Sequence, residues 1–153
     1  IRKGGPVTIT DERMTRFLLS LDHAVNVIFA ALTGAKRGQT FVPNAPAARM
    51  IDIAKVLIGD RKIDTKVIGV RPGEKIHEIL VSEDEARRTW RSGQYLVIDP
   101  ILPELATEPG GPPIGQEYSS GDEVIDLPAV ADLLKRHNLL YDEAAPVGNE
   151  VLR

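Results

Sequence analysis

The chain has 153 residues, which suits one compact domain with a single core. Its composition, 42% hydrophobic and 27% charged, is typical of a soluble globular protein, and a formal net charge of −3 excludes the basic field that attracts nucleic acid. The sequence has no cysteine, so disulfides and thiolate metal sites are excluded, and no run of about 18 apolar residues indicates a membrane span.

Hydrophobic periodicity and turn residues predict strands and helices in alternation along the chain. Strands are indicated by short apolar or alternating runs, and helices by apolar residues that recur every three or four positions. The predicted strands are 7–10, 16–21, 39–42, 66–70 and 95–98. The predicted helices are 21–33, 50–58, 76–80, 83–90 and 127–137. This order indicates an α/β domain, or a small domain of α+β character.

Capping residues support several of these boundaries. Ser20 and Asp126 are placed to cap the first and last helices, and Gly59 is placed to end the helix at 50–58. Ser82 and Glu85 form the pattern of a capping box. Because the first helix carries an apolar stripe, we expect it to be buried.

Two stretches predict no regular structure. Residues 100–117 are rich in proline and glycine, so we expect a surface loop there. We predict one domain over residues 1–140, which includes this loop, and a flexible C-terminal tail at 141–153. The chain begins at Ile1 with neither a methionine nor a signal peptide, and we expect it to start within a longer protein.

The densest group of charged residues follows the fourth predicted strand. Its members are Arg71, Glu74, Lys75, His77 and Glu78. A strand-to-helix junction exposes side chains and free backbone N–H groups, which suit an anionic ligand. The planar guanidinium of Arg71 could hold two phosphate oxygens, and Glu74 could accept hydrogen bonds from ribose hydroxyls. The alternative is a charged surface turn in which Arg71 and Glu74 pair with each other; His77 alone is more typical of a helix surface than of a catalyst.

Arg16 is the second candidate. It lies in the mostly apolar stretch 14–19, where an unpaired cation would be costly. A structural salt bridge with Asp11 or Asp22 accounts for it equally well.

Two motifs of dinucleotide-dependent enzymes are missing. The glycine-dense stretch 110–115 contains two prolines and follows a loop, so it does not resemble the G-x-G-x-x-G fingerprint. No tyrosine is followed four residues later by a lysine, the spacing that places an ammonium beside a phenol. We therefore expect no catalytic, cofactor-binding or metal-binding residue in this chain.

Several short motifs occur in order between Gly4 and about Leu140. They are Gly4-Gly5-Pro6-Val7-Thr8-Ile9-Thr10-Asp11, Met14-Thr15-Arg16-Phe17, Phe41-Val42-Pro43, Arg71-Pro72-Gly73-Glu74-Lys75 with His77-Glu78, Ser82-Glu83-Asp84-Glu85 and Glu117-Tyr118-Ser119-Ser120-Gly121. In these motifs the chain resembles the C-terminal part of the capsule and O-antigen polysaccharide biosynthesis proteins. That group contains UDP-N-acetylglucosamine 4,6-dehydratases and related C4 epimerases, within the extended short-chain dehydrogenase/reductase superfamily. The stretch 45–48 is smaller and less basic than in many relatives.

The resemblance implies the substrate-binding portion of such an enzyme, with the Rossmann half absent. The intact enzyme would bind NAD or NADP in that N-terminal half and oxidise the sugar at C4. By motif position the substrate-binding residues are Arg16, Arg71, Glu74, Lys75, His77 and Glu78. Among them, Arg16 and Arg71 would hold the UDP diphosphate, and Glu74 would reach the ribose.

Three functions stay open at this point. The first is part of a UDP-N-acetylglucosamine 4,6-dehydratase of surface polysaccharide biosynthesis, the second part of a UDP-sugar C4 epimerase, and the third a non-catalytic binding or assembly module. The expected partners are a UDP-sugar and the protein's own Rossmann domain, without nucleic acid. We also expect a cytoplasmic homo-oligomer, and self-association of the isolated segment through exposed apolar surface.

Overall fold

The computed structural model describes residues 1, 4–105 and 108–140. The predicted tail at 141–153 lies outside the described residues. The helices are α1 (Leu21–Gly34), α2 (Met50–Ile58), α3 (Glu83–Ala86) and α4 (Leu127–Arg136), with a 3-10 turn at Pro103–Leu105. The strands are β1 (Val7–Ile9), β2 (Thr15–Phe17), β3 (Thr40–Pro43), β4 (Ala47–Arg49), β5 (Thr65–Val67), β6 (Ile79–Val81), β7 (Thr89–Ser92), β8 (Tyr95–Ile98) and β9 (Tyr118–Ser119).

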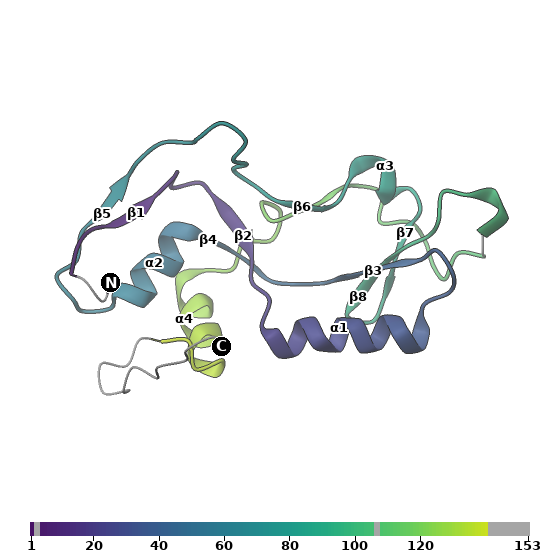
Figure 1. Cartoon of the computed structure of the whole chain (residues 1–153), viewed down its shortest axis with the longest axis horizontal. Coiled ribbons are helices and arrows are strands. Elements are labelled where there is room, and N and C mark those ends of the chain that lie inside the picture. The colour runs from purple at the N-terminus through teal and green to yellow at the C-terminus, as the bar shows by residue number, and fades with distance from the viewer. Residues whose placement is uncertain (2–3, 106–107, 141–153) are drawn as a thin grey trace, which may run out of the picture.

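Within the described residues, the strands form four small sheets instead of one continuous sheet. β1 and β5 pair in parallel, whereas β2 with β4, and β6 with β9, are antiparallel pairs. The largest sheet is antiparallel, in the order β3-β8-β7. In Figure 1, β1, β5, α2 and α4 gather toward one end of an elongated molecule, and the three-stranded sheet with α3 lies toward the other. The expected mixed α/β small domain is confirmed.

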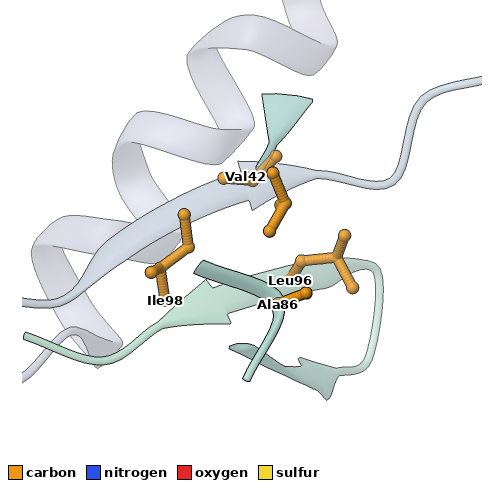
Figure 2. Close-up of a cluster of buried hydrophobic side chains, with 5 residues drawn as sticks. Val42, Ala86, Leu96 and Ile98 are labelled. Atoms are coloured by element: carbon orange, nitrogen blue, oxygen red, sulfur yellow. The ribbon is translucent and has the colours of Figure 1, made fainter. Parts of the chain in front are cut away.

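In the described part of the chain, the buried hydrophobic residues form three small clusters. Figure 2 shows one of them, in which Val42, Leu96 and Ile98 of the three-stranded sheet meet Ala86 of α3. The other two clusters are Ile9 with Ile51 and Ala54, and Ala48 with Val130 and Leu134. Because α2 contributes residues to the second and packs on α4, these clusters fix the end of the molecule that carries β1 and β2.

Three helix boundaries follow the caps read from the sequence. The Ser20 hydroxyl accepts the backbone N–H of His23 at 3.2 Å, and the Asp126 carboxylate accepts that of Ala129 at 3.0 Å. The capping box of Ser82 and Glu85 is formed. The Glu85 carboxyl accepts hydrogen bonds from the side chain and the backbone of Ser82. These bonds, chiefly the one from the side chain, hold the pKa of Glu85 below its usual range.

The expectation that the first helix is buried is wrong. α1 lies alongside β3, as Figure 1 shows, but no residue of α1 is fully buried. Leu21 is 80% exposed, Phe29 61% and Leu32 76%. The half-buried residues of α1 are His23, Ala24, Val27, Ala30 and Ala31, so most of the large apolar side chains of this helix face outward.

Two further predictions are corrected by strand pairing. The helix predicted at 76–80 is absent, because residues 76–78 bond to other segments and Ile79 begins β6, which pairs with β9. The helix predicted at 83–90 ends at Ala86, since Trp90 belongs to β7 and forms a hairpin with β8. Gly93, with φ +58°, lies in the turn of that hairpin. Among the described residues, no helix has both the length and the apolar character needed to cross a membrane.

Candidate functional site

Three segments that are far apart in the sequence meet at one place, which we call the junction: residues 15–16, 75–78 and 119–121. The backbone N–H of Thr15 donates to the carbonyl of Ile76 at 2.9 Å. On the other side, the N–H of Ser120 donates to the carbonyl of Glu78 at 2.8 Å. Residues 75–78 are thus held between β2 and the loop that follows β9, and they cannot form the predicted helix.

Arg16 lies inside the junction and bonds to its backbone. Its Nη1 donates to the carbonyl of Thr15 at 2.6 Å and to that of Ile76 at 3.3 Å. Its Nη2 donates to the carbonyl of Lys75 at 3.0 Å, and its Nε lies 3.5 Å from the Glu78 carboxylate. Since a guanidinium has five N–H donors, one N–H on Nη2 is left for any ligand.

The salt bridge considered for Arg16 from the sequence has a different partner. Asp11 forms its ion pair with Arg13 instead, with 2.9 Å between the Arg13 Nη2 and the Asp11 carboxylate. The carboxylate beside Arg16 is that of Glu78. Hydrogen bonds from Arg13, chiefly from its side chain and to a lesser extent from its backbone, lower the pKa of Asp11 from 3.8 to about 2.

Two buried hydroxyls connect the junction. Thr15 and Ser120 are 2% and 0% exposed, and their hydroxyl oxygens lie 2.7 Å apart. The Ser120 hydroxyl also accepts the backbone N–H of Glu78 at 2.9 Å. The Thr15 hydroxyl lies 2.8 Å from Nδ1 of His77, so one side of this imidazole is bonded to the interior.

Gly121 lies directly against the His77 ring. A Cβ built on Gly121 would lie 3.0 Å from Nδ1 of His77 and 3.1 Å from its Cγ. Any larger residue at 121 would therefore push the ring away from its present position. Tyr118, in β9 just before this loop, packs against Phe17 with ring centroids 4.9 Å apart and ring planes tilted by 45°, and burial raises the pKa of this tyrosine.

Arg71 and Glu74 lie in an exposed turn at 68–74, which we call the turn. The backbone N–H of Arg71 donates to Oε2 of Glu74 at 3.0 Å, and the N–H of Glu74 donates to the carbonyl of Arg71 at 3.1 Å. Pro72 and Gly73 occupy the central positions, where the fixed φ of proline and the φ of +86° of Gly73 fit. The turn is thus closed by its own residues.

The guanidinium of Arg71 is not used by the turn. Among residues 1, 4–105 and 108–140, no hydrogen bond or ion pair engages its side chain, and the residue is exposed. Glu74 pairs with the backbone of Arg71 and not with its guanidinium, which removes the ion pair of the surface-turn alternative. Arg71 is therefore an available cation, and Glu74 keeps Oε1 for a ligand.

The structure thus separates the predicted site residues into two groups. It brings Arg16, His77 and Glu78 together with the backbone of Lys75, while Arg71 and Glu74 stand in the adjoining turn. In the part of the chain that the structure describes, no hydrogen bond or ion pair joins the side chain of Arg16 to either Arg71 or Glu74.

Sequence reasoning missed Thr15 and Ser120 as members of the site. Both occur in motifs that the resemblance singled out, and each is a small hydroxyl residue next to a charged or glycine residue. Their bond spans 105 positions, so local pattern gave no sign of it.

The glycine-dense stretch 110–115 does not have the form of a phosphate loop. A Cβ on Gly110 would lie 2.3 Å from the Trp90 ring, and Pro113 forms an isolated bridge with Trp90. Gly110 thus packs directly against the Trp90 ring. Within the described residues, no group of three or more His, Asp or Glu side chains could hold a metal ion.

Comparison with known proteins gives a consistent family. A family model described as "Polysaccharide biosynthesis protein" matches residues 1–100, which include β2 and the turn. The chain is 37% identical over 94 residues to the UDP-N-acetylglucosamine 4,6-dehydratase (inverting) of Campylobacter jejuni, covering 61% of this chain and 28% of that protein. It is 38% identical over 97 residues to the UDP-glucose 4-epimerase of Rickettsia canadensis, covering 62% and 28%.

A solved structure agrees with the fold. The X-ray structure of Pen from Bacillus thuringiensis matches with a TM-score of 0.78 and 27% sequence identity. The match covers 90% of this chain and 43% of that chain. The chain thus corresponds to 28% of the length of these two curated relatives and less than half of the solved structure.

Proposed function

The chain belongs to the polysaccharide biosynthesis protein family, and from this premise we propose that it is the sugar-nucleotide-binding part of a UDP-N-acetylglucosamine 4,6-dehydratase of capsule or O-antigen biosynthesis. The observation that carries the proposal is the turn, where a closed backbone presents Arg71 with no partner among the described residues. A planar guanidinium in this state suits two oxygens of a diphosphate.

The other predicted residues support the same ligand in smaller roles. Arg16 contributes one N–H at most, because its other donors hold the junction. Glu74 offers Oε1 to a ribose hydroxyl, and Lys75 adds an exposed positive charge near the turn. Glu78 balances the charge of Arg16, and the positive charges of Arg71 and Lys75 exceed the negative charge of Glu74 by one.

We propose that the cofactor, NAD or NADP, binds in a part of the intact protein outside this chain. When bound, it would accept hydride from C4 of the sugar. The residues of this chain bind and orient the nucleotide, and they hold no group that we assign to the chemical step. We also propose a cytoplasmic location, which a sequence without cysteine fits.

The apolar face of α1 supports a partner domain. Leu21, Val25, Ile28, Phe29 and Leu32 are all exposed on this helix. A face of this kind is unfavourable in water unless another surface covers it. Since the curated relatives are more than three times as long as the matched region, we propose that the cofactor-binding part of the same protein covers α1.

Product analysis tests the proposed reaction. The full-length protein is incubated with UDP-N-acetylglucosamine and the product is identified by NMR. A 4-keto-6-deoxy sugar supports the dehydratase. A sugar inverted only at C4 establishes instead the epimerase, the alternative favoured by the similarity to the Rickettsia enzyme. Binding without turnover would establish a non-catalytic module, and absence of binding would refute the sugar-nucleotide site.

A further inference from the structure

We propose that Thr15, Ser120 and Gly121 are positioning residues that fix the imidazole of His77 so that its Nε2 meets the diphosphate of the nucleotide. The inference deepens the proposed function and rests on it. It starts from an asymmetry within one residue: His77 is exposed overall, but its Nδ1 is bonded to the buried hydroxyl of Thr15.

The burial of the two hydroxyls requires a reason. Removing a hydroxyl from water is unfavourable unless it is hydrogen-bonded, and the apolar isosteres of Thr15 and Ser120 would avoid that cost. The Ser120 hydroxyl is explained by the Glu78 N–H that it accepts. Among the described residues the Thr15 hydroxyl bonds only to Ser120 and His77, so its contribution beyond the bond to Ser120 is to hold the ring.

Two proton arrangements of this network allow Nε2 to donate. If the Ser120 hydroxyl donates to Thr15 and Thr15 donates to Nδ1, the neutral imidazole carries its proton on Nε2. If His77 is cationic, Nδ1–H donates to Thr15, Thr15 to Ser120, and Ser120 to the carbonyl of Thr15 at 3.3 Å. In both of these arrangements every hydroxyl proton has an acceptor and Nε2 keeps an N–H, which suits a phosphate oxygen. A neutral ring with its proton on Nδ1 fits the same bonds but leaves Nε2 without a proton, so a bound phosphate would favour the first two arrangements.

Gly121 provides an independent reason to regard the ring position as fixed. Its φ is not in the left-handed region, so the backbone does not require glycine there. The contact that excludes a side chain is the His77 ring itself. The loop thus accommodates the ring closely on one side, while Thr15 bonds it on the other.

A role in folding alone does not need this arrangement. The three segments of the junction are already joined by backbone bonds at Thr15 and Ser120 and by the Arg16 guanidinium. Fixing one exposed imidazole adds little to them. No hydrogen bond engages Nε2 among the described residues, so this nitrogen of the fixed ring is available to a ligand.

The test measures UDP binding to the full-length protein by calorimetry. Thr15→Val removes the hydroxyl at nearly constant shape, and Gly121→Ala crowds the ring, which must shift by a few tenths of an ångström, while both hydroxyls stay. We expect each to weaken UDP binding about tenfold, the loss of one hydrogen bond to a charged group. Thr15→Ser, which keeps the hydroxyl, and Gly111→Ala, whose Cβ would meet Trp90 only at 3.9 Å, are expected to bind UDP within about twofold of wild type.

A second readout separates ring positioning from general stability. The ¹⁵N resonances of His77, assigned by their loss in His77→Asn, are expected to show Nδ1 hydrogen-bonded in the wild type and Thr15→Ser but not in Thr15→Val. Unchanged UDP affinity in Thr15→Val and Gly121→Ala, or equal weakening in Thr15→Ser, overturns this inference alone. A wild-type protein that does not bind UDP overturns the proposed function together with it.

Discussion

Arg16 in the junction and Arg71 in the turn are two arginines to which the sequence assigned one role, and the structure gives them opposite surroundings. Arg16 bonds three backbone carbonyls and lies beside the Glu78 carboxylate, with its side chain 28% exposed. Arg71 is exposed on a turn that is closed by other atoms. The comparison shows that an arginine of a binding motif can serve either to hold the motif together or to bind the ligand. The number of its N–H donors that are not already hydrogen-bonded within the protein distinguishes the two roles.

The difference has a local cause. Arg16 lies in β2, whose pairing with β4 fixes its backbone and directs its side chain toward residues 75–78. Arg71 follows Gly69 and Val70, beyond the end of β5, and its own turn uses only its backbone. Strand pairing thus directs the Arg16 side chain into hydrogen bonds within the protein, while the turn leaves the Arg71 side chain available to a ligand.

Removing the Arg16 side chain should have the largest effect on structure. Arg16→Ala leaves carbonyls of the junction without their charged donor, and we expect local stability to fall by about 3 kcal/mol. Hydrogen exchange of the amides at 75–78 in the full-length protein measures this, with Arg71→Ala as the matched control that leaves exchange there unchanged. Equal hydrogen exchange in Arg16→Ala and wild type would contradict the claim that Arg16, unlike Arg71, stabilises the junction.

A smaller effect is expected from the carboxylate that closes the turn. Glu74→Ala removes the acceptor for the Arg71 N–H, so the amides at 71–74 should lose about 1 kcal/mol of protection. Glu74→Gln, which keeps an acceptor oxygen, should retain most of it. If the alanine variant exchanges at the wild-type rate, the turn is not held by Glu74 and Arg71 is less ordered than we infer.

The smallest effect is expected for Arg13, which forms a surface ion pair with Asp11. This exposed pair serves as a reference for the effects expected at Arg16 and Arg71. The pKa of Asp11 is lowered from 3.8 to about 2 by Arg13. A lowered carboxyl pKa stabilises the folded state above the unfolded value and ceases to do so as pH falls through the folded value. The contribution should therefore fade between about pH 4 and pH 2 and vanish in Asp11→Asn. An NMR titration follows the Asp11 carboxyl. If it gives the unperturbed pKa of 3.8, the ion pair with Arg13 does not form.

Much of the fold could be predicted where a signal is local. The helix at 50–58 with Gly59 after it, and the final helix capped by Asp126, follow from period and caps that lie within a few residues. The helix predicted at 76–80 failed because Ile76, Ile79 and Leu80 have helical spacing, but the carbonyl of Ile76 bonds Thr15 and Ile79 pairs with Ser119. Partners 40 to 60 positions away are invisible to a local pattern.

The candidate site was predictable in part for the same reason. The motif pointed to Arg71 and to Arg16 alike, since residue type and position do not reveal which donors are already used. Thr15 and Ser120 could not be paired from the sequence, because only the folded chain brings their hydroxyls to 2.7 Å. The stripe on α1 was read correctly as apolar, but the pattern could not tell whether this chain or another surface covers it.

The most direct test of the account is the affinity of the full-length protein for UDP-N-acetylglucosamine, measured by calorimetry in wild type, Arg71→Ala and Arg37→Ala. Arg37 is an exposed arginine in the segment after α1 and serves as the matched control. Loss of a charge-assisted contact worth about 1.5–3 kcal/mol should weaken binding about 10- to 150-fold in Arg71→Ala and leave Arg37→Ala unchanged. Equal affinity in all three proteins would contradict the assignment of the turn to the nucleotide.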